Sequence, residues 1–360
     1  MSDPNLTILV TIRGRRYTLP RVMCYYNDFP AKVIYLDSTP GEPYEEKARS
    51  GPHLYKHLPG KGYIEKIADC LKEVDTDYCI IMCDDDFLTK TSAIQSLEFL
   101  DTNKNYVAAW GQEICLRDED LVVESYDYIA KNIEPFDDPE SRVIAHWRYF
   151  NGGIVHTICR TEALRKVFDF HIENEDLDAI RYFDKTFGFC LAALGNIACL
   201  HLFHILRSSE TGSPSLLLSD NETWTSNWKP HLRFNRDFTN HNLQPLADLI
   251  GSDTDLIEQL HSELSVGDYK KALHFSVMAQ TPTKVEDFRN IPHLRRKVRG
   301  RPIFVSHGPG ANFDGHDNYR ERASYIADPA FAYPCCSPLI DNDLNIILEH
   351  VDKYPLPGKE

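Results

Sequence analysis

The sequence lacks any apolar run long enough to cross a membrane. A membrane-spanning helix needs about 20 predominantly apolar residues, and no stretch of the 360 residues approaches that. The first residues, Met1 to Asn5, contain neither a basic segment nor an apolar one, so we expect no secretory signal. Both absences predict a cytoplasmic location.

Positive charge is scarce as well. The chain carries 39 Lys and Arg against 54 Asp and Glu, a formal net charge of −15. Binding to nucleic acid without sequence preference requires a basic surface, so we expect no nucleic-acid partner. One basic segment stands out at residues 293–301. It predicts either an ordinary solvated surface or a contact with an anion, such as a phosphorylated acceptor or the inner face of a membrane.

Several metal and phosphate motifs are missing. The ten cysteines show no paired zinc-type spacing, and we expect reduced thiols because no secretory signal is present. The segment from Asp341 begins like a calcium loop but has Ile346 where glycine is required. The short glycine segments at residues 60–62 and 308–310 do not make a phosphate loop.

The most informative feature present is a run of three aspartates, Asp84, Asp85 and Asp86, directly after the apolar segment 79–83. An uninterrupted apolar run of this length predicts a strand buried on both faces of a parallel sheet. Ligands gather at the carboxyl ends of such strands. Clustered carboxylates repel one another unless they share a cation, and oxygen ligands favour Mg²⁺ or Mn²⁺. A solvated acidic loop or a helix N-cap is the alternative interpretation.

The segments before the aspartates predict an α/β fold. Residues 6–12 and 32–36 have the composition of strands, and residues 64–74 have the apolar spacing of an amphipathic helix. Strand, helix, strand, helix and strand in succession are typical of a nucleotide-binding half-domain. Later predicted elements are helices at 91–100, 161–168, 243–263 and 266–279, and strands at 106–111, 152–159 and 196–206.

With these residues the chain resembles GT-A-fold glycosyltransferases of the family 2 type, in the bacterial branch that builds surface polysaccharides. The resemblance covers roughly residues 6–207. It depends on the DxD segment 78–86, on the acidic pair Glu175 and Asp176, and on the run from Arg181 to His204. It implies a Rossmann-like nucleotide-diphospho-sugar transferase fold, a mixed sheet flanked by helices, with a largely helical C-terminal extension.

The resemblance also implies a domain division and an activity. Residues 1–207 would form the catalytic domain, with a nucleotide-sugar half to about residue 111 and an acceptor half from 112 to 207. Residues 208–360 would supply a lid loop and a mainly helical region. The implied reaction moves a sugar from a nucleotide-sugar donor to a hydroxyl of a glycan or glycolipid acceptor, with Mn²⁺ or Mg²⁺ as cofactor.

Particular positions acquire roles from the same resemblance. Asp176 would be the general base that deprotonates the acceptor, with Glu175 as the next candidate. The implied metal ligands are Asp86, Asp84 and His204. The implied donor-binding residues are Thr11, Arg13, Asp37, Lys66, Asp84, Asp85 and Arg207. His204 is alternatively a hydrogen-bonded core residue, and acidic residues around 173–178 are alternatively the first turn of a helix.

The chemistry of glycosyl transfer requires such groups. Negative charge builds on the leaving phosphate, where a divalent cation offsets it. A carboxylate on the opposite face of the sugar takes the acceptor proton, and direct displacement inverts the anomeric centre. Two acidic clusters are therefore expected, and the sequence contains two.

Three other functions remain open from sequence. A sugar nucleotidylyltransferase prefers a glycine-rich, basic loop after the first strand, which residues 13–16 faintly match. An Asp-based phosphatase also has Asp-x-Asp after a strand, but normally the first strand, and with Thr or Val where Leu88 stands. A non-catalytic sugar-binding protein is the third. The donor, the acceptor, the linkage and the oligomeric state are not encoded in these motifs.

Overall fold

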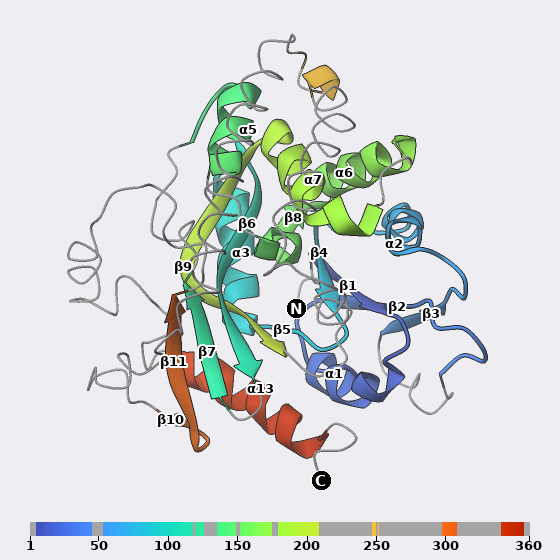
Figure 1. Cartoon of the computed structure of the whole chain (residues 1–360), viewed down its shortest axis with the longest axis vertical. Coiled ribbons are helices and arrows are strands. Elements are labelled where there is room, and N and C mark those ends of the chain that lie inside the picture. The colour runs from blue at the N-terminus through green and yellow to red at the C-terminus, as the bar shows by residue number, and fades with distance from the viewer. Residues whose placement is uncertain are drawn as a thin grey trace, which may run out of the picture.

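The computed structural model describes residues 5–44, 53–117, 120–125, 135–148, 152–174, 179–208, 247–249, 251, 297–307 and 340–355. Within them the chain forms a mixed 11-stranded sheet with helices on both faces (Figure 1). The strand order is β10-β11-β7-β6-β8-β4-β1-β2-β3, and β9 joins beside β6 and also pairs with β5. The predicted fold class, a mixed sheet flanked by helices, is confirmed.

The strands are β1 (Leu6–Ile12), β2 (Lys32–Asp37), β3 (Leu54–His57), β4 (Tyr78–Cys83), β5 (Phe87–Leu88), β6 (Tyr106–Arg117), β7 (Asp120–Ser125), β8 (Ile158–Arg160), β9 (Asn196–Ser208), β10 (Lys297–Val298) and β11 (Arg301–His307). The α-helices are α1 (Leu19–Tyr26), α2 (Tyr63–Leu71), α3 (Lys90–Thr102), α5 (Pro139–Arg148), α6 (Thr161–Glu173), α7 (Ala179–Leu194) and α13 (Asp341–Lys353), and the 3₁₀ turns are η1 (Arg16–Thr18) and η3 (Gly152–His156).

The N-terminal half is built on parallel strands. β1 pairs in parallel with β2 on one side and with β4 on the other. All seven residues of β1 are buried, because alternate side chains enter different cores. Ile8 packs with α1, α3 and α13 on one face, whereas Leu9 packs with α2, α6 and α7 on the other. This confirms the buried parallel strands that the apolar runs predict.

The second half contains one error of the sequence-based prediction. Residues 152–159 were expected as a continuous strand, but Gly152–His156 form the turn η3 and only Ile158–Arg160 extend as β8. The Thr157 hydroxyl donates to the carbonyl of Ile154 at 2.5 Å. Such a local hydrogen bond offers the backbone an alternative to a strand ladder.

The described C-terminal elements pack onto the same sheet. β11 pairs in parallel with β7, and Leu344, Ile347 and Leu348 of α13 enter the core that contains β1. The boundary at residue 207 stays a prediction, and the helices predicted at 243–263 and 266–279 lie outside the described residues apart from 247–249 and 251.

The basic segment 293–301 is described only from residue 297 onward. Arg299 and Arg301 both contact Asp352 of α13, at 3.1 and 2.7 Å. Part of its positive charge is therefore paired within the fold, and a membrane or phosphate contact stays a prediction. Among the described residues, no helix combines the length and the apolarity needed to span a membrane, and none of the eight described cysteines forms a disulfide.

Candidate functional site

The carboxyl ends of β1, β2 and β4 meet at one edge of the sheet. In the parallel registers Thr11 lies opposite Cys83, and Ile12 lies opposite Asp37. The side chains that follow these strands are therefore held side by side by the backbone ladder. Among the predicted site residues, Thr11, Asp37 and the aspartates after Cys83 are brought together in this way.

The three aspartates form a buried turn. Asp84, Asp85 and Asp86 are only 1, 4 and 3% exposed. The turn is fixed because β5 follows at once and pairs antiparallel with β9. Two tyrosines of α1 secure it further: the Tyr25 hydroxyl donates to the carbonyl of Leu88 at 2.6 Å, and Tyr26 accepts from its N–H at 3.0 Å.

Arg15 is the principal cation of this turn. Its guanidinium contacts a carboxylate oxygen of Asp84 and lies 2.6 Å from Asp85. Burial, and then the negative charge of Asp85, raise the pKa of Asp84 to about 7 even though Arg15 opposes the shift. The second oxygen of Asp84 is buried without a hydrogen bond. The turn thus holds more carboxylate than Arg15 stabilises, which favours a further cation.

Asp37, at the end of β2, is completely buried and strongly hydrogen-bonded. It accepts from Arg16 Nε at 2.6 Å, from the N–H of Thr39 at 2.9 Å and from the Tyr55 hydroxyl. Burial alone would raise the pKa of Asp37, but these hydrogen bonds lower it overall. The carboxylate is therefore ionised and rigid, as an acceptor for a base N–H group needs to be.

Lys66 does not face the site edge as an exposed cation. It is 2% exposed, and its ammonium group donates to the carbonyls of Ile12 and Leu36 and to Ser38 Oγ at 3.0 to 3.2 Å. Burial lowers the pKa of Lys66 to about 8. The side chain connects the ends of β1 and β2 and so positions the edge. Arg13, by contrast, is exposed.

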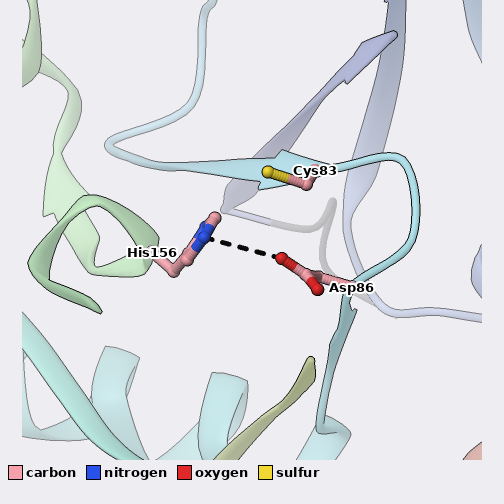
Figure 2. A group of neighbouring side chains, drawn as sticks. All are labelled: Cys83, Asp86 and His156. Carbon is pink, nitrogen blue, oxygen red and sulfur yellow. Dashed lines mark ion pairs between the residues drawn. The ribbon is translucent and has the colours of Figure 1, made fainter. Parts of the chain in front are cut away.

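Cys83, Asp86 and His156 form a second group beside the aspartate turn (Figure 2). One ligand atom of each, Sγ, a carboxylate oxygen and a ring nitrogen, lies within 4.8 Å of the others. His156 Nε2 is 3.5 Å from Asp86 Oδ2. Burial lowers the pKa of His156, which keeps the ring neutral near pH 7.

The structure places His204 as a hydrogen-bonded core residue, which was the alternative interpretation of its position in the sequence. One ring nitrogen pairs with the Ser92 hydroxyl, and Nε2 lies 2.8 Å from the carbonyl oxygen of His156. Both nitrogens are thus engaged in the core, where burial lowers the pKa to about 4. His204 thus hydrogen-bonds to the backbone of the last residue of η3, His156. The side chain of His156 is the one that faces Asp86.

The end of β9 places Arg207 and Ser208 next to the aspartate turn. The Ser208 N–H donates to Asp86 Oδ1 at 3.2 Å. Arg207 lies 3.3 Å from the buried Glu113 of β6, and its positive charge opposes the rise in the pKa of Asp86 that burial causes. Arg207 therefore lies near the aspartate turn, and its contact with a diphosphate stays a prediction.

A divalent cation fits these residues. Asp86 Oδ2 and His156 Nε2 face one another, and the unbonded oxygen of Asp84 is buried in the same turn. Carboxylate oxygen and imidazole nitrogen are both common metal ligands. The predicted general bases, Glu175 and Asp176, lie outside the described residues, so their roles stay predictions.

Five contributors escaped the sequence-based prediction: Arg15, Arg16, Tyr55, Cys83 and His156. The two arginines follow Arg13 in the loop after β1, which was a usable signal. Tyr55 and His156 carried none, because a tyrosine in a short strand and a histidine in an apolar segment are usual in any core.

Known proteins give limited help. No family model and no curated protein matches the chain. Among solved structures, TarS of S. aureus (residues 1–349, in complex with UDP-GlcNAc) aligns at 16% identity over 74% of this chain and 81% of that chain, with a TM-score of 0.44. A putative nucleotide-diphospho-sugar transferase of Desulfovibrio desulfuricans G20 aligns at 13% identity, over 71% of this chain and 98% of that chain, with a TM-score of 0.32. CMP:2-keto-3-deoxy-manno-octonic acid synthetase in complex with CTP aligns at 11% identity, over 60% of this chain and 96% of that chain, with a TM-score of 0.33.

Proposed function

We propose that the chain is a metal-dependent glycosyltransferase. It would transfer a sugar from a nucleotide-sugar donor to a hydroxyl of a glycan or glycolipid, with inversion, in the synthesis of a bacterial surface polysaccharide. The observation that carries the proposal is the convergence of Asp37 and the aspartate turn at the carboxyl edge of β1, β2 and β4. This edge is where open α/β sheets bind nucleotides.

The donor would lie along this edge. Asp37 would accept a hydrogen bond from the base, since Arg16, Thr39 and Tyr55 already hold its carboxylate ionised. Thr11 and Arg13 would flank the nucleotide at the end of β1. The ribose or sugar would contact Asp84 and Asp85, while Arg15 and Arg207 supply positive charge for the diphosphate.

The metal would be held by Asp86, with Asp84 and His156 as neighbouring donors. When bound, a divalent cation offsets the charge that develops on the leaving diphosphate. Asp176, or Glu175 in its place, would take the proton of the acceptor hydroxyl from the opposite face of the sugar. A product that retains the anomeric configuration of the donor would exclude this arrangement.

A sugar nucleotidylyltransferase is the second candidate. The observation in its favour is the arginine-containing loop after β1, in which Arg15 and Arg16 both contact carboxylates of the site edge. Such an enzyme would release pyrophosphate from a nucleoside triphosphate and a sugar 1-phosphate. A glycosyltransferase would instead release a nucleoside diphosphate or monophosphate from a nucleotide sugar.

The deciding experiment is a panel of UDP-, GDP-, CMP- and dTDP-sugars, each with and without a divalent cation, measured by thermal shift. A ligand at a hundred times its dissociation constant stabilises the folded state by about 2.7 kcal/mol. We expect one nucleotide class to give a metal-dependent shift that Asp86→Ala abolishes. Asp75→Ala is the matched control, because Asp75 is exposed and pairs with the surface residue Lys32 at 2.7 Å.

The reaction is then tested with the nucleotide sugar that binds. Slow donor hydrolysis, lost in Asp86→Ala and kept in Asp75→Ala, supports transfer chemistry. Pyrophosphate release from a triphosphate and a sugar 1-phosphate, without donor hydrolysis, would replace the proposal with the second candidate. Absence of binding across the whole panel would mean a donor outside the panel or another class of reaction, and phosphatase and nucleotidylyltransferase assays would then decide.

A further inference from the structure

We propose that Cys83, Asp86 and His156 form a thiolate-containing metal site that takes a transition ion, Zn²⁺ foremost, in preference to Mg²⁺. The inference rests on the proposed function only in placing this ion next to a donor diphosphate. Occupancy of the site by the ion does not depend on the reaction.

The first argument is the convergence of three different donors from three segments. Cys83 ends β4, Asp86 closes the aspartate turn, and His156 is the last residue of η3. Tetrahedral zinc with its usual bond lengths places neighbouring ligand atoms about 3.5 Å apart. The 3.5 Å between His156 Nε2 and Asp86 Oδ2 matches, and all three ligand atoms lie within 4.8 Å of one another.

The second argument is the orientation of the imidazole. His156 Nδ1 lies 3.1 Å from the carbonyl oxygen of Ile81, which can only accept, so Nδ1 carries the proton. In the neutral ring Nε2 then presents its lone pair to Asp86. A histidine that binds a metal through one ring nitrogen usually donates the N–H of the other nitrogen to a carbonyl or carboxylate oxygen.

The carboxylate of Asp86 is also oriented by a backbone hydrogen bond. Its Oδ1 accepts from the Ser208 N–H at 3.2 Å, which leaves Oδ2 towards His156. A lone pair and a carboxylate oxygen that face each other are stabilised by a positive centre between them, which either a proton or a metal ion supplies. A cation bound there satisfies both atoms at once.

The same three residues do not form a nucleophilic triad. In a Cys–His–Asp triad one ring nitrogen serves the nucleophile and the other serves the carboxylate. Here Nδ1 of His156 is occupied by Ile81. Only Nε2 remains for both Asp86 and Cys83, an arrangement that suits a shared ion rather than a proton relay.

The donor set decides the class of ion. Mg²⁺ prefers six oxygen ligands in a regular octahedron, whereas thiolate and imidazole favour zinc and its neighbours. Three protein ligands also leave a fourth position open, as at catalytic zinc sites. Cys83 is partly exposed as a residue, while Asp86 and His156 are buried.

The test titrates the metal-free full chain with Co²⁺, Zn²⁺, Mn²⁺ and Mg²⁺, without any nucleotide. Co²⁺ is followed through the near-ultraviolet charge-transfer absorption that a cobalt–thiolate bond produces, and the other ions by competition. We expect one Co²⁺ to bind with this absorption, and Zn²⁺ to displace it at least 100-fold more effectively than Mg²⁺.

Variants connect the signal to the site. Cys83→Ser should remove the charge-transfer absorption, and His156→Gln should weaken Zn²⁺ binding at least tenfold. Cys79→Ser is the matched control, since Cys79 is a buried thiol of the same strand outside the cluster. Circular dichroism and a thermal melt establish that each variant folds.

Two outcomes would overturn the inference. Comparable binding of Mg²⁺ and Zn²⁺, unchanged in Cys83→Ser, would mean an oxygen-only site. Absence of binding by all four ions in the folded protein would mean that His156 and Asp86 form only a structural pair. Failure of glycosyl transfer alone leaves the titration result intact, so the two proposals fail separately.

Discussion

Among single residues, Lys66 holds the site edge in place although burial of its charge is unfavourable. Its ammonium group is buried and donates to the backbone carbonyls of β1 and β2. Three hydrogen bonds offset only part of the lost hydration, and the pKa falls from 10.5 to about 8. Lys66 therefore holds together the ends of β1 and β2, next to Asp37.

Lys66 predicts a change of stability with alkaline pH. Between about pH 8 and 10.5 the unfolded chain keeps the proton that the folded chain has lost, so the free energy of unfolding rises with pH. The rise attributable to Lys66 amounts to roughly 3 kcal/mol. Urea denaturation of the wild type and of Lys66→Met across this range should show the stability difference between them growing in favour of the wild type as the pH rises, whatever the buried tyrosines and cysteines contribute to both. Parallel curves would contradict a lowered pKa.

We expect substitution of Asp37 to weaken binding of the donor nucleotide. Asp37→Asn keeps the shape of the side chain but removes the charge that Arg16 and Tyr55 stabilise. Hydrogen bonds to a charged group contribute about 1.5–3 kcal/mol, so nucleotide affinity should fall roughly 10- to 100-fold. Calorimetric titration with the nucleotide sugar found in the panel measures the loss. Asp75→Asn should bind as the wild type does, and equal affinity of the two variants would remove Asp37 from the base site.

At the level of secondary-structure elements, helices α5 and α7 pack unusually close together. A Cβ placed on Gly188 of α7 would lie 2.2 Å from Nε2 of the buried His146 of α5. Only glycine allows this distance, although glycine inside a helix costs about 1 kcal/mol relative to alanine. Packing between the helices therefore outweighs helix propensity at this position.

Gly188→Ala is expected to destabilise the fold by about 1–3 kcal/mol, as overpacking of a filled core does. Gly62→Ala is the control, because a Cβ there meets nothing within 4 Å, and it should change stability by less than about 1 kcal/mol. Chemical denaturation measures both. A second substitution, His146→Ala, should relieve part of the clash in Gly188→Ala, whereas a stabilising effect of Gly188→Ala would show that the helices separate easily.

At the scale of the whole molecule, the two ends of the described chain share one core. Leu344, Ile347 and Leu348 of α13 are fully buried beside α1 and β1, and the ring of His350 lies edge-on to Tyr25, with centroids 5.5 Å apart. Tyr25 in turn holds the segment after the aspartate turn through Leu88. The C-terminal helix thus contributes to the rigidity of the site.

Leu348→Ala is predicted to lower the free energy of unfolding by about 2–5 kcal/mol, in one cooperative transition. Glu349→Ala, at an exposed neighbouring position, should stay within about 0.5 kcal/mol of the wild type. Denaturation followed by circular dichroism and by tryptophan fluorescence distinguishes the two variants. A loss no larger than that of Glu349→Ala, or a separate early transition, would mean that α13 is not part of the common core.

Apolar runs and polar breaks along the chain were enough to locate the strands β1, β2 and β4, their burial, and the edge at which Asp37 and the three aspartates lie. These properties depend on apolar runs and on helix periodicity, which are local and therefore visible along the chain. The helix stripe from Ile64 to Leu71 and the strand that follows it were found in the same way.

The groups that face those aspartates depend on contacts between segments far apart in the sequence. Arg15 reaches Asp85 across 70 positions of sequence, and His156 reaches Ile81 across 75. Such contacts come from how the sheet closes and how η3 folds beside it, and no local pattern encodes them. For this reason the edge at which these residues lie was predictable, whereas Arg15, the histidine that faces Asp86 and the cysteine beside them were not.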